Sequence, residues 1–319
     1  MYYIDRITLT DASFLAGSVA EPAAGETVWA VGAHAVGDEV IRPSLHRVFK
    51  CAVARTGADT LPPEQDATSW KDMRSTKRWT PLGPLVRADG KLVYESHALE
   101  STSGDIEYHL KLRYCNAVAL YGLRGAEWSV EVYANDAAPA PVKTFTGTIK
   151  APAMGYYDYA YGQRRYRDRK LITGLPIYPA AKVVIKIKGS GSQMRRVTQI
   201  DVGRLRFIPG MSWGGVLAGL TRTPRAYTYR TEEKDGSSTT LIYGTTYDMA
   251  GQIKLNGSSE DNALVQLRNL LGKGISFAPT LAPGFEQSLV FGTLEEAPTT
   301  RESKPISSIS FQIRGLPTS

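Results

Sequence analysis

Apolar and polar residues alternate with a period of two along much of the chain. The clearest run covers residues 106–114, and shorter runs cover residues 128–132, 183–188 and 309–314. Side chains of a strand point alternately to its two faces, so each run predicts a strand with one buried face. We therefore expect antiparallel sheets whose second face is wet or available to a neighbouring subunit.

One segment in the last third of the chain has helical periodicity instead. Leu264, Leu267 and Leu271 form an apolar stripe at helical spacing. A serine at position 258 or 259 can cap the start of this helix, and Gly272 can end it. Many short strands and a single helix are typical of stacked β-sandwiches, so the pattern predicts an all-β fold.

Breaks in composition divide the chain into three predicted units. Proline and glycine gather at residues 81–84 and again at 209–215. We therefore predict an N-terminal arm and a small three-stranded module in residues 1–82, followed by two β-sandwich domains. The first sandwich domain covers residues 83–210, and the second covers residues 211–319 and contains the short helix.

The beginning of the chain predicts an assembly element. Tyr3, Ile4, Ile7 and Leu9 form a short apolar pattern, and small residues with a Pro-Ala-Ala-Gly run at 22–25 follow it. A strand-forming end on a pliable tether can add to the sheet edge of a neighbour. The alternative is a frayed terminus.

Composition is that of an ordinary globular protein, with 42% hydrophobic and 22% charged residues in 319. A chain of this length buries a sizeable core without covalent links. Cys51 and Cys115 are the two cysteines and belong to no metal-binding or disulfide pattern. We predict two buried free thiols and folding in a reducing cytoplasm.

The formal net charge of +7 raises the question of nucleic-acid or membrane binding. The basic residues are scattered, however, and no apolar run approaches the 18 or so residues of a membrane span. Residues 1–20 contain neither a basic start nor an apolar core of the kind that signal peptides have. We therefore expect no membrane insertion and no nucleic-acid partner.

One dense cluster of tyrosine and arginine is the exception to this scatter. Basic residues between aromatic ones can bind single-stranded nucleic acid, but Tyr and Arg also anchor protein interfaces. We predict a contact with another subunit, made by Tyr156, Tyr157, Tyr159, Tyr161, Arg164, Arg165, Tyr166 and Arg167.

Catalytic and metal-binding patterns do not stand out. The histidines are His34, His46, His97 and His109, and none forms a metal-binding pair with another. No nucleophile elbow, phosphate-binding loop or dinucleotide fingerprint occurs. We expect no catalytic residue, no metal ligand, no cofactor and no enzymatic activity. A polysaccharide-degrading enzyme stays open as a third alternative, because the fold could bring two carboxylates together.

Residues 29–73 predict a small three-stranded module. A Gly-Asp turn lets two short strands pair, and tryptophans can close a core that is otherwise too small. The predicted core residues are Trp29, Gly37, Asp38, Val40, Phe49 and Trp70.

The order of these features resembles the small carbohydrate-binding modules of chitinases. Trp29 is followed by Gly-Asp-x-Val at 37–40, His-Arg-x-Phe at 46–49, two prolines at 62–63 and Trp70. Tail proteins of tailed bacteriophages reuse a similar motif. The resemblance to chitinase modules implies glycan binding, and the resemblance to tail proteins implies a structural part of a virion.

Further segments resemble those phage proteins. Residues 9–12, 19–21 and 76–79 are similar to segments around their module, and residues 116–123 and 201–205 are similar to strands of the sandwich that follows it. We therefore expect a symmetric homo-oligomer in the tail tip or baseplate, assembled in the host cytoplasm with other tail proteins.

One departure from the chitinase pattern concerns the sugar site. Where chitinase modules carry exposed aromatics, this chain has Ala-Val-Ala-Arg-Thr at residues 52–56, and His34 replaces the usual tyrosine. Alanine and valine offer little stacking surface to a sugar ring. The module is therefore expected to be a structural scaffold, and an adhesin that binds host surface glycans is the alternative function.

Overall fold

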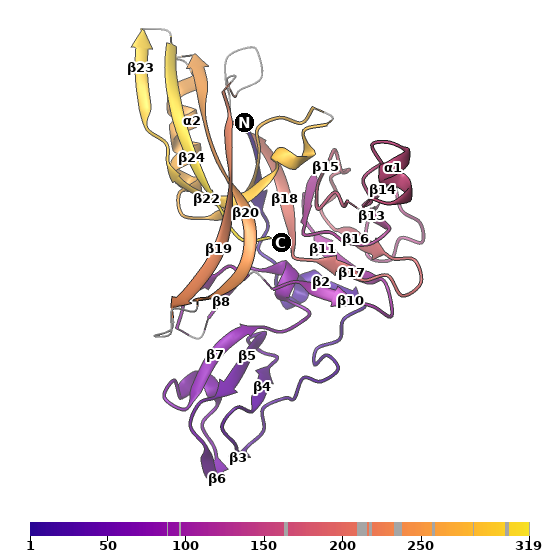
Figure 1. The fold of residues 1–319 in the computed structure, drawn as a ribbon, viewed down its shortest axis with the longest axis vertical. Coiled ribbons are helices and arrows are strands. Elements are labelled where there is room, and N and C mark those ends of the chain that lie inside the picture. Colours follow the sequence, from indigo (N-terminus) through magenta and orange to yellow (C-terminus); the bar gives the residue numbers. More distant parts are fainter. Residues whose placement is uncertain are drawn as a thin grey trace.

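The computed structural model describes residues 1–87, 89–95, 97–162, 165–208, 216, 219–232, 238–256, 259–282, 284–303 and 306–318. Strands dominate these residues, and the longer helix lies in the last third of the chain, so the predicted all-β fold with one short helix is confirmed. Figure 1 shows an elongated molecule with a large sheet at one end and a small module at the other. No helix within the described residues has the length and apolar character that a membrane crossing requires.

A curled antiparallel sheet of ten strands forms the main body. Strand β1, from the beginning of the chain, lies between three strands from the middle of the chain and the strands from its last third. One edge strand, β23 (Thr299–Ser303), pairs only with β24. The other nine follow the order β15 (Arg169–Thr173), β12 (Ala117–Tyr121), β18 (Gln199–Phe207), β1 (Tyr2–Arg6), β21 (Gly274–Ala278), β22 (Val290–Glu296), β24 (Ile306–Gly315), β20 (Ser238–Asn256) and β19 (Thr221–Glu232).

A second antiparallel sheet packs on one end of the first and makes a β-sandwich. Side chains of β11 and β16 meet side chains of β12 and β18 in one apolar cluster, which includes Leu110, Ile185, Leu120 and Val202. All four are 0–1% exposed. The five strands in order are β14 (Lys143–Thr148), β13 (Glu127–Tyr133), β16 (Ala181–Lys188), β11 (Ile106–Leu112) and β2 (Phe14–Gly17).

Helix α2 (Glu260–Leu270) covers the part of the large sheet that is built from the end of the chain. Ala263, Leu267 and Leu270 are buried against β20 and β24, and Ser259 occupies the N-cap position. Leu271 of the predicted stripe is 44% exposed, because the helix ends one residue before it. Gly272 then adopts a φ of +71°, a conformation that suits glycine at a helix end.

The three-stranded module predicted near the N-terminus is present. Its sheet has the order β4 (Glu39–Arg42), β5 (Arg47–Cys51) and β7 (Trp70–Ser75). A separate pair, β3 (Gly32–His34) and β6 (Arg55–Asp59), lies at the far tip of the module. The remaining short elements are the pairs β8 (Leu85–Val86) with β9 (Leu92–Val93) and β10 (Leu99–Ser101) with β17 (Arg195–Val197), helix α1 (Tyr156–Ala160), and the 3-10 turns η1 (Asp11–Ser13), η2 (Pro63–Gln65), η3 (Thr80–Leu82) and η5 (Glu286–Ser288).

The predicted N-terminal arm is wrong. Strand β1 lies inside the large sheet, where its residues pair with 203–207 of β18 on one side and with 277–278 of β21 on the other. Met1, Tyr3 and Ile4 are 0%, 6% and 1% exposed. The apolar pattern at the start of the chain therefore belongs to the core of this molecule.

Candidate interaction surfaces

Of the predicted module core, Val40, Phe49 and Trp70 are buried, whereas Trp29 is half-buried and Gly37 and Asp38 are exposed. Val40 pairs with Phe49 across β4 and β5, and both are buried. Trp70 on β7 is 2% exposed and closes the cluster together with Cys51. The turn before β4 depends on Gly37, whose φ is +97°, and its amide donates to the carbonyl of Cys51 at 2.8 Å.

Trp29 and His34 lie at the margin of this core. The Trp29 ring is half-buried, and the Arg42 guanidinium stands 5.1 Å from its centre. The His34 ring contacts the Trp70 ring edge-on at 5.0 Å. Neither tryptophan therefore presents a free, flat face of the kind on which a sugar ring stacks.

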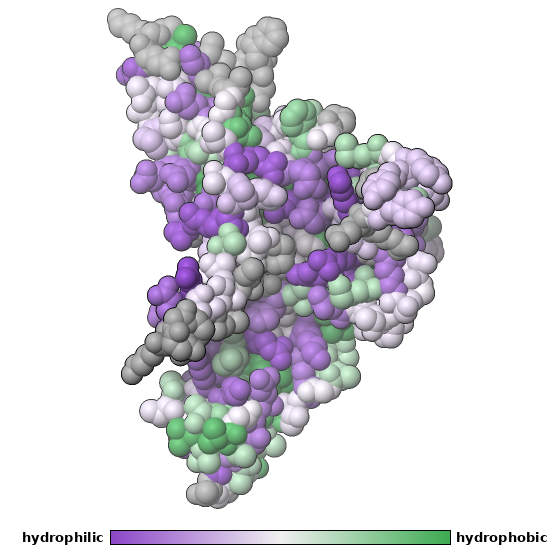
Figure 2. Space-filling model, in the orientation of Figure 1, coloured by the Kyte–Doolittle hydropathy of each residue, from purple (hydrophilic) through white to green (hydrophobic). Residues whose placement is uncertain are grey.

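The outer surface of the module is aliphatic. Val31, Val36 and Val53 are 58%, 64% and 56% exposed, and Leu61 is 49% exposed. Apolar residues are visible on the module end of the molecule in Figure 2. Exposed aliphatic residues favour contact with another protein, because they supply apolar area without an aromatic platform.

Glu21 joins the module to the body. Its carboxylate accepts hydrogen bonds from Thr76 at 2.5 Å and from the Trp79 indole at 3.1 Å, and His46 lies at 3.1 Å. The side chain is 4% exposed. The His46 ring stacks on Trp79 with centres 4.1 Å apart. Arg78 lies 3.7 Å from Glu21 and adds a positive charge. These contacts hold the segment before the module, around Glu21, against the segment after it, residues 76–79.

The Glu21 carboxylate should make stability depend on pH. Burial alone raises its pKa, but the hydrogen bonds from His46 and Thr76 and the nearby positive charges outweigh burial and hold the pKa below its ordinary value. The stabilisation is therefore present above the unfolded-state pKa of about 4.3 and is lost as the pH falls through the lower folded-state pKa.

We expect Glu21→Gln to lower the free energy of unfolding by about 1–3 kcal/mol at pH 7. The difference from the wild type should shrink as the pH falls below about 4. Urea denaturation between pH 3 and 7 measures this, with Glu127→Gln as the control, because Glu127 is an exposed carboxylate at the start of β13. A difference that does not change with pH would contradict the assigned role of the charge.

A second polar network holds the module from the other side. The Arg47 side chain is 1% exposed, and its guanidinium donates to Asp72 at 2.6 and 2.8 Å and to Glu95 at 2.5 Å. Glu95 lies after β9 and also accepts from the backbone amide of Ser75. Because two carboxylates satisfy the guanidinium, a buried arginine is tolerated here. The network ties β5 and β7 of the module to the hairpin β8–β9.

Helix α1 carries the predicted tyrosine cluster and projects from the sandwich (Figures 1 and 2). Tyr156, Tyr157, Tyr159 and Tyr161 are 83%, 77%, 81% and 75% exposed, and Met154 is 84% exposed. Tyr157 and Tyr161 contact each other with ring centres 5.5 Å apart. Four aromatic rings, three on this short helix and Tyr161 directly after it, thus have most of their surface in water.

The arginine half of the cluster has a different position. The Tyr166 side chain is half-buried against the sandwich core, and its backbone forms an isolated antiparallel β-bridge with Lys150. Arg165 and Arg167 are exposed and lie on the segment that returns to β15, while Arg164 lies outside the described residues. Arg165 Nη1 lies 3.5 Å from Met154 Sδ, beside the tyrosine-bearing helix. Arg167 instead lies near Glu286 of η5, where the hydrogen bond from Lys170 and then the charge of Arg167 lower the pKa of that carboxyl.

Among the histidines, His46 contacts two carboxylates, Glu21 at 3.1 Å and Asp11 at 3.3 Å. Within the described residues there is no group of three or more His, Cys, Asp or Glu side chains arranged to hold a metal ion. His109 on β11 lies 3.5 Å from Glu107 of the same strand. Cys51 and Cys115 are buried, as predicted, and form no disulfide; burial raises the pKa of the Cys115 thiol to about 11, so that this thiol is protonated at neutral pH.

Comparison with known proteins identifies no relative. Neither protein-family models nor curated protein sequences nor solved structures give a match to this chain. The fold and its surfaces define a β-sandwich protein with an attached three-stranded module, and function has to be inferred from those surfaces.

Proposed function

We propose that this protein is a structural component of the tail tip or baseplate of a tailed bacteriophage, where copies of it assemble symmetrically with other tail proteins. The observation that carries the proposal is the exposed cluster Tyr156, Tyr157, Tyr159 and Tyr161, on helix α1 and directly after it. Tyrosine combines a large contact area with few rotatable bonds, and it is enriched at protein interfaces. Four such rings in water are costly unless another protein covers them.

The segments that resemble phage tail proteins support this proposal, because they lie next to one another. Residues 19–21 and 76–79 meet through Glu21 and Trp79 at the joint of the module. Residues 116–123 and 201–205 include strands β12 and β18, which pair directly with Ala117 opposite Gly203. This adjacency supports the proposal as far as it makes the resembling segments two continuous parts of the fold.

An adhesin for host surface glycans is the second candidate, and the order of the module motifs favours it. The burial of Trp70 and the aliphatic residues Val31, Val36 and Val53 weigh against sugar stacking on the module. A glycan array with the purified protein separates the two proposals. Binding that depends on the module would favour the adhesin.

The tyrosine cluster offers the direct test of assembly. Replacing Tyr156, Tyr157, Tyr159 and Tyr161 by serine should change the free energy of unfolding by less than ~1 kcal/mol, because all four are exposed. Incorporation into tail particles should fall by at least ~10-fold, since buried tyrosines at interfaces often contribute ~2 kcal/mol each. Complementation of a phage lacking the gene, followed by quantification of the protein in purified particles, measures the effect.

Phe285→Ser is the matched control, because Phe285 is an exposed aromatic residue outside the cluster, at 59% exposure. Normal incorporation of the fourfold variant would refute the interface. Salt-sensitive binding of single-stranded DNA by the wild type, lost in the variant, would instead indicate that the cluster binds nucleic acid.

A further inference from the structure

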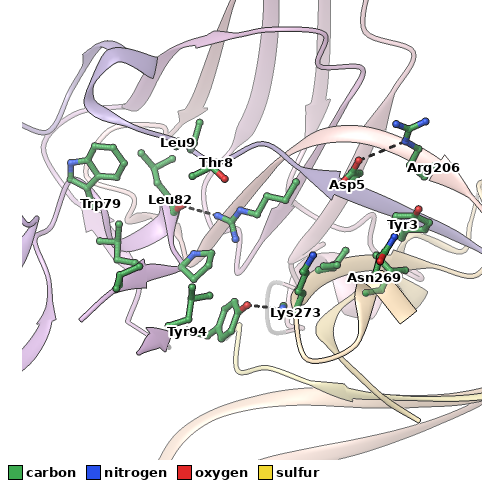
Figure 3. A pocket seen from close by; sticks show the side chains of 18 of the residues that line it. Tyr3, Asp5, Thr8, Leu9, Trp79, Leu82, Tyr94, Arg206, Asn269 and Lys273 are labelled. Atoms are coloured by element: carbon green, nitrogen blue, oxygen red, sulfur yellow. Dashed lines mark hydrogen bonds and ion pairs between the residues drawn. The ribbon is translucent and has the colours of Figure 1, made fainter. Parts of the chain in front are cut away.

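A cavity of about 770 Å³ lies between strand β1, the hairpin β8–β9 and helix α2. It is separate from both the tyrosine cluster and the module core. Figure 3 shows its two ends: Trp79, Leu82 and Leu9 lie at one, and Lys273 and Asn269 lie at the other. Cavities of 300–1,000 Å³ with an apolar lining and a few polar groups are typical of binding sites.

The hairpin β8–β9 forms the apolar wall. Val86 and Leu92 pair with each other, line the cavity and are 54% and 55% exposed. The two strands have two residues each and form a sheet of their own. A two-stranded sheet of this length is marginal in water, and its free edges can accept a further strand.

The opposite wall is basic. Lys273, after the end of α2, has no ion-pair partner within the described residues, and Arg206 is 51% exposed on its side chain. Asp5 lies 3.7 Å from Arg206 and is the acidic residue of the lining. The lining has three cations, but Asp5 pairs with Arg206 and the buried Asp201 pairs with Arg6 at 3.4 Å, which leaves a net charge of +1, carried by Lys273.

Two buried polar atoms of the lining have no hydrogen-bond partner within the described chain. They are Nη1 of Arg6, a donor, and Oε1 of Gln266, an acceptor. The other end of the Arg6 guanidinium is engaged, because Nη2 donates to the carbonyl of Leu82 at 2.7 Å. Each of these two atoms exposes less than 1 Å², so it adds to the polarity of the wall around the cavity without contacting a ligand directly.

The lining distinguishes between classes of ligand. Trp79 and Tyr3 are 1% and 6% exposed, and the half-buried Tyr94 packs edge-on against Phe291 with its hydroxyl held by the Gly274 amide, so none of the three offers a broad free face to a sugar. Aliphatic side chains make up the apolar wall, and Lys273 and Arg206 attract carboxylates. A polypeptide supplies all the required groups together: apolar side chains, carboxylates, and a backbone with both N–H and C=O groups.

We propose that this cavity binds an extended peptide segment in which acidic and apolar residues alternate. Its apolar side chains pack on Val86 and Leu92, its carboxylates face Lys273 and Arg206, and its backbone pairs with the free edge of the hairpin. This proposal rests on the proposed function in one respect, namely that the bound peptide segment belongs to a neighbouring tail protein. The cavity itself can be tested on the purified chain.

The test uses three fluorescent hexapeptides of alternating sequence, namely Asp-Leu, Lys-Leu and Asp-Ser repeats, and measures fluorescence anisotropy at 50 and 300 mM salt. Only the Asp-Leu peptide should bind, and more weakly at the higher salt concentration. Lys273→Glu should weaken binding by ~10-fold or more through repulsion of the carboxylates. Val86→Asp should also weaken binding, because it places a charge in the apolar wall. Val86 and Lys273 are both exposed, so neither substitution should disturb folding.

Arg268→Glu is the matched control, because Arg268 is an exposed residue of α2 that changes the net charge equally and lies outside the cavity lining. Absence of binding by the Asp-Leu peptide, equal binding of the Lys-Leu peptide, or an equal loss in Arg268→Glu would each overturn the proposal. Binding of octanoate or glucuronate but of no peptide would assign the cavity to a small carboxylate instead. Failure of the tyrosine variants to affect assembly would leave this result unchanged, so the two proposals fail separately.

Discussion

Deleting residues 1–6 should abolish the folded state. Strand β1 is paired on both sides, and the deletion removes the buried Tyr3 and Ile4, each worth about 1.5–3 kcal/mol of apolar burial. It also removes Arg6 and leaves Asp201 buried without its ion-pair partner, at a further cost of about 3–5 kcal/mol. The sum is comparable with the whole stability of a typical domain, about 5–15 kcal/mol.

The measurement is thermal unfolding followed by circular dichroism. The deletion variant should give no cooperative transition, or should be recovered as insoluble protein. Asp5→Asn is the control within the same strand, because its ion pair with Arg206 joins two side chains that are each more than half exposed. Such a pair contributes about 0–1 kcal/mol. If the deletion variant melted like the intact chain, residues 1–6 would not be needed for folding, as the sequence pattern suggests for an N-terminal arm.

Local patterns predicted the local structure of this protein well. The alternation predicted over residues 106–114 became strand β11 over Ile106–Leu112, with Ile106, Tyr108, Leu110 and Leu112 buried, while Tyr114 lies past the end of the strand and is 44% exposed. The Gly-Asp turn before Val40 led to the predicted pairing of strands. These features depend on residues that are close in the chain, where side-chain period and turn chemistry determine the outcome.

The partners of distant segments could not be predicted in the same way. Strand β1 pairs with residues about 200 and 270 positions away, and its five residues contain no information about which edges they join. Arg47 shows the same limit for side chains, because an arginine beside an apolar strand is expected in water. Its burial depends on Asp72 and on Glu95, which the chain brings back after another hairpin.

The candidate surfaces divide in the same manner. Tyr156 to Tyr161 were recognised from composition alone, since a cluster of tyrosines without strand alternation has no place in a core. The cavity between β1 and α2 had no signal in the sequence, because its lining comes from segments as far apart as Tyr3 and Lys273. Tyr166 was grouped with the exposed tyrosines, but its side chain packs partly on the sandwich core.

Trp70→Ala should destabilise the module strongly and thereby decide whether this tryptophan supports the fold or binds a ligand. Trp70 is 2% exposed and packs on Val40, Phe49 and Cys51. Replacing a buried tryptophan by alanine typically lowers the free energy of unfolding by about 3–5 kcal/mol, because transfer energy is lost and a cavity remains. Urea denaturation followed by circular dichroism, with a glycan array on each variant, measures both properties.

Trp29→Ala is the comparison that makes this result specific. Trp29 is half-buried at the margin of the same cluster, so its replacement should cost less than that of Trp70. A scaffold predicts that stability falls in the order wild type, Trp29→Ala, Trp70→Ala. A sugar platform predicts the reverse pattern for Trp70, namely unchanged unfolding with lost glycan binding. That outcome would assign the module a role in host recognition and not in assembly. An exposed stacking residue can be removed without leaving a cavity, so the free energy of unfolding would not change.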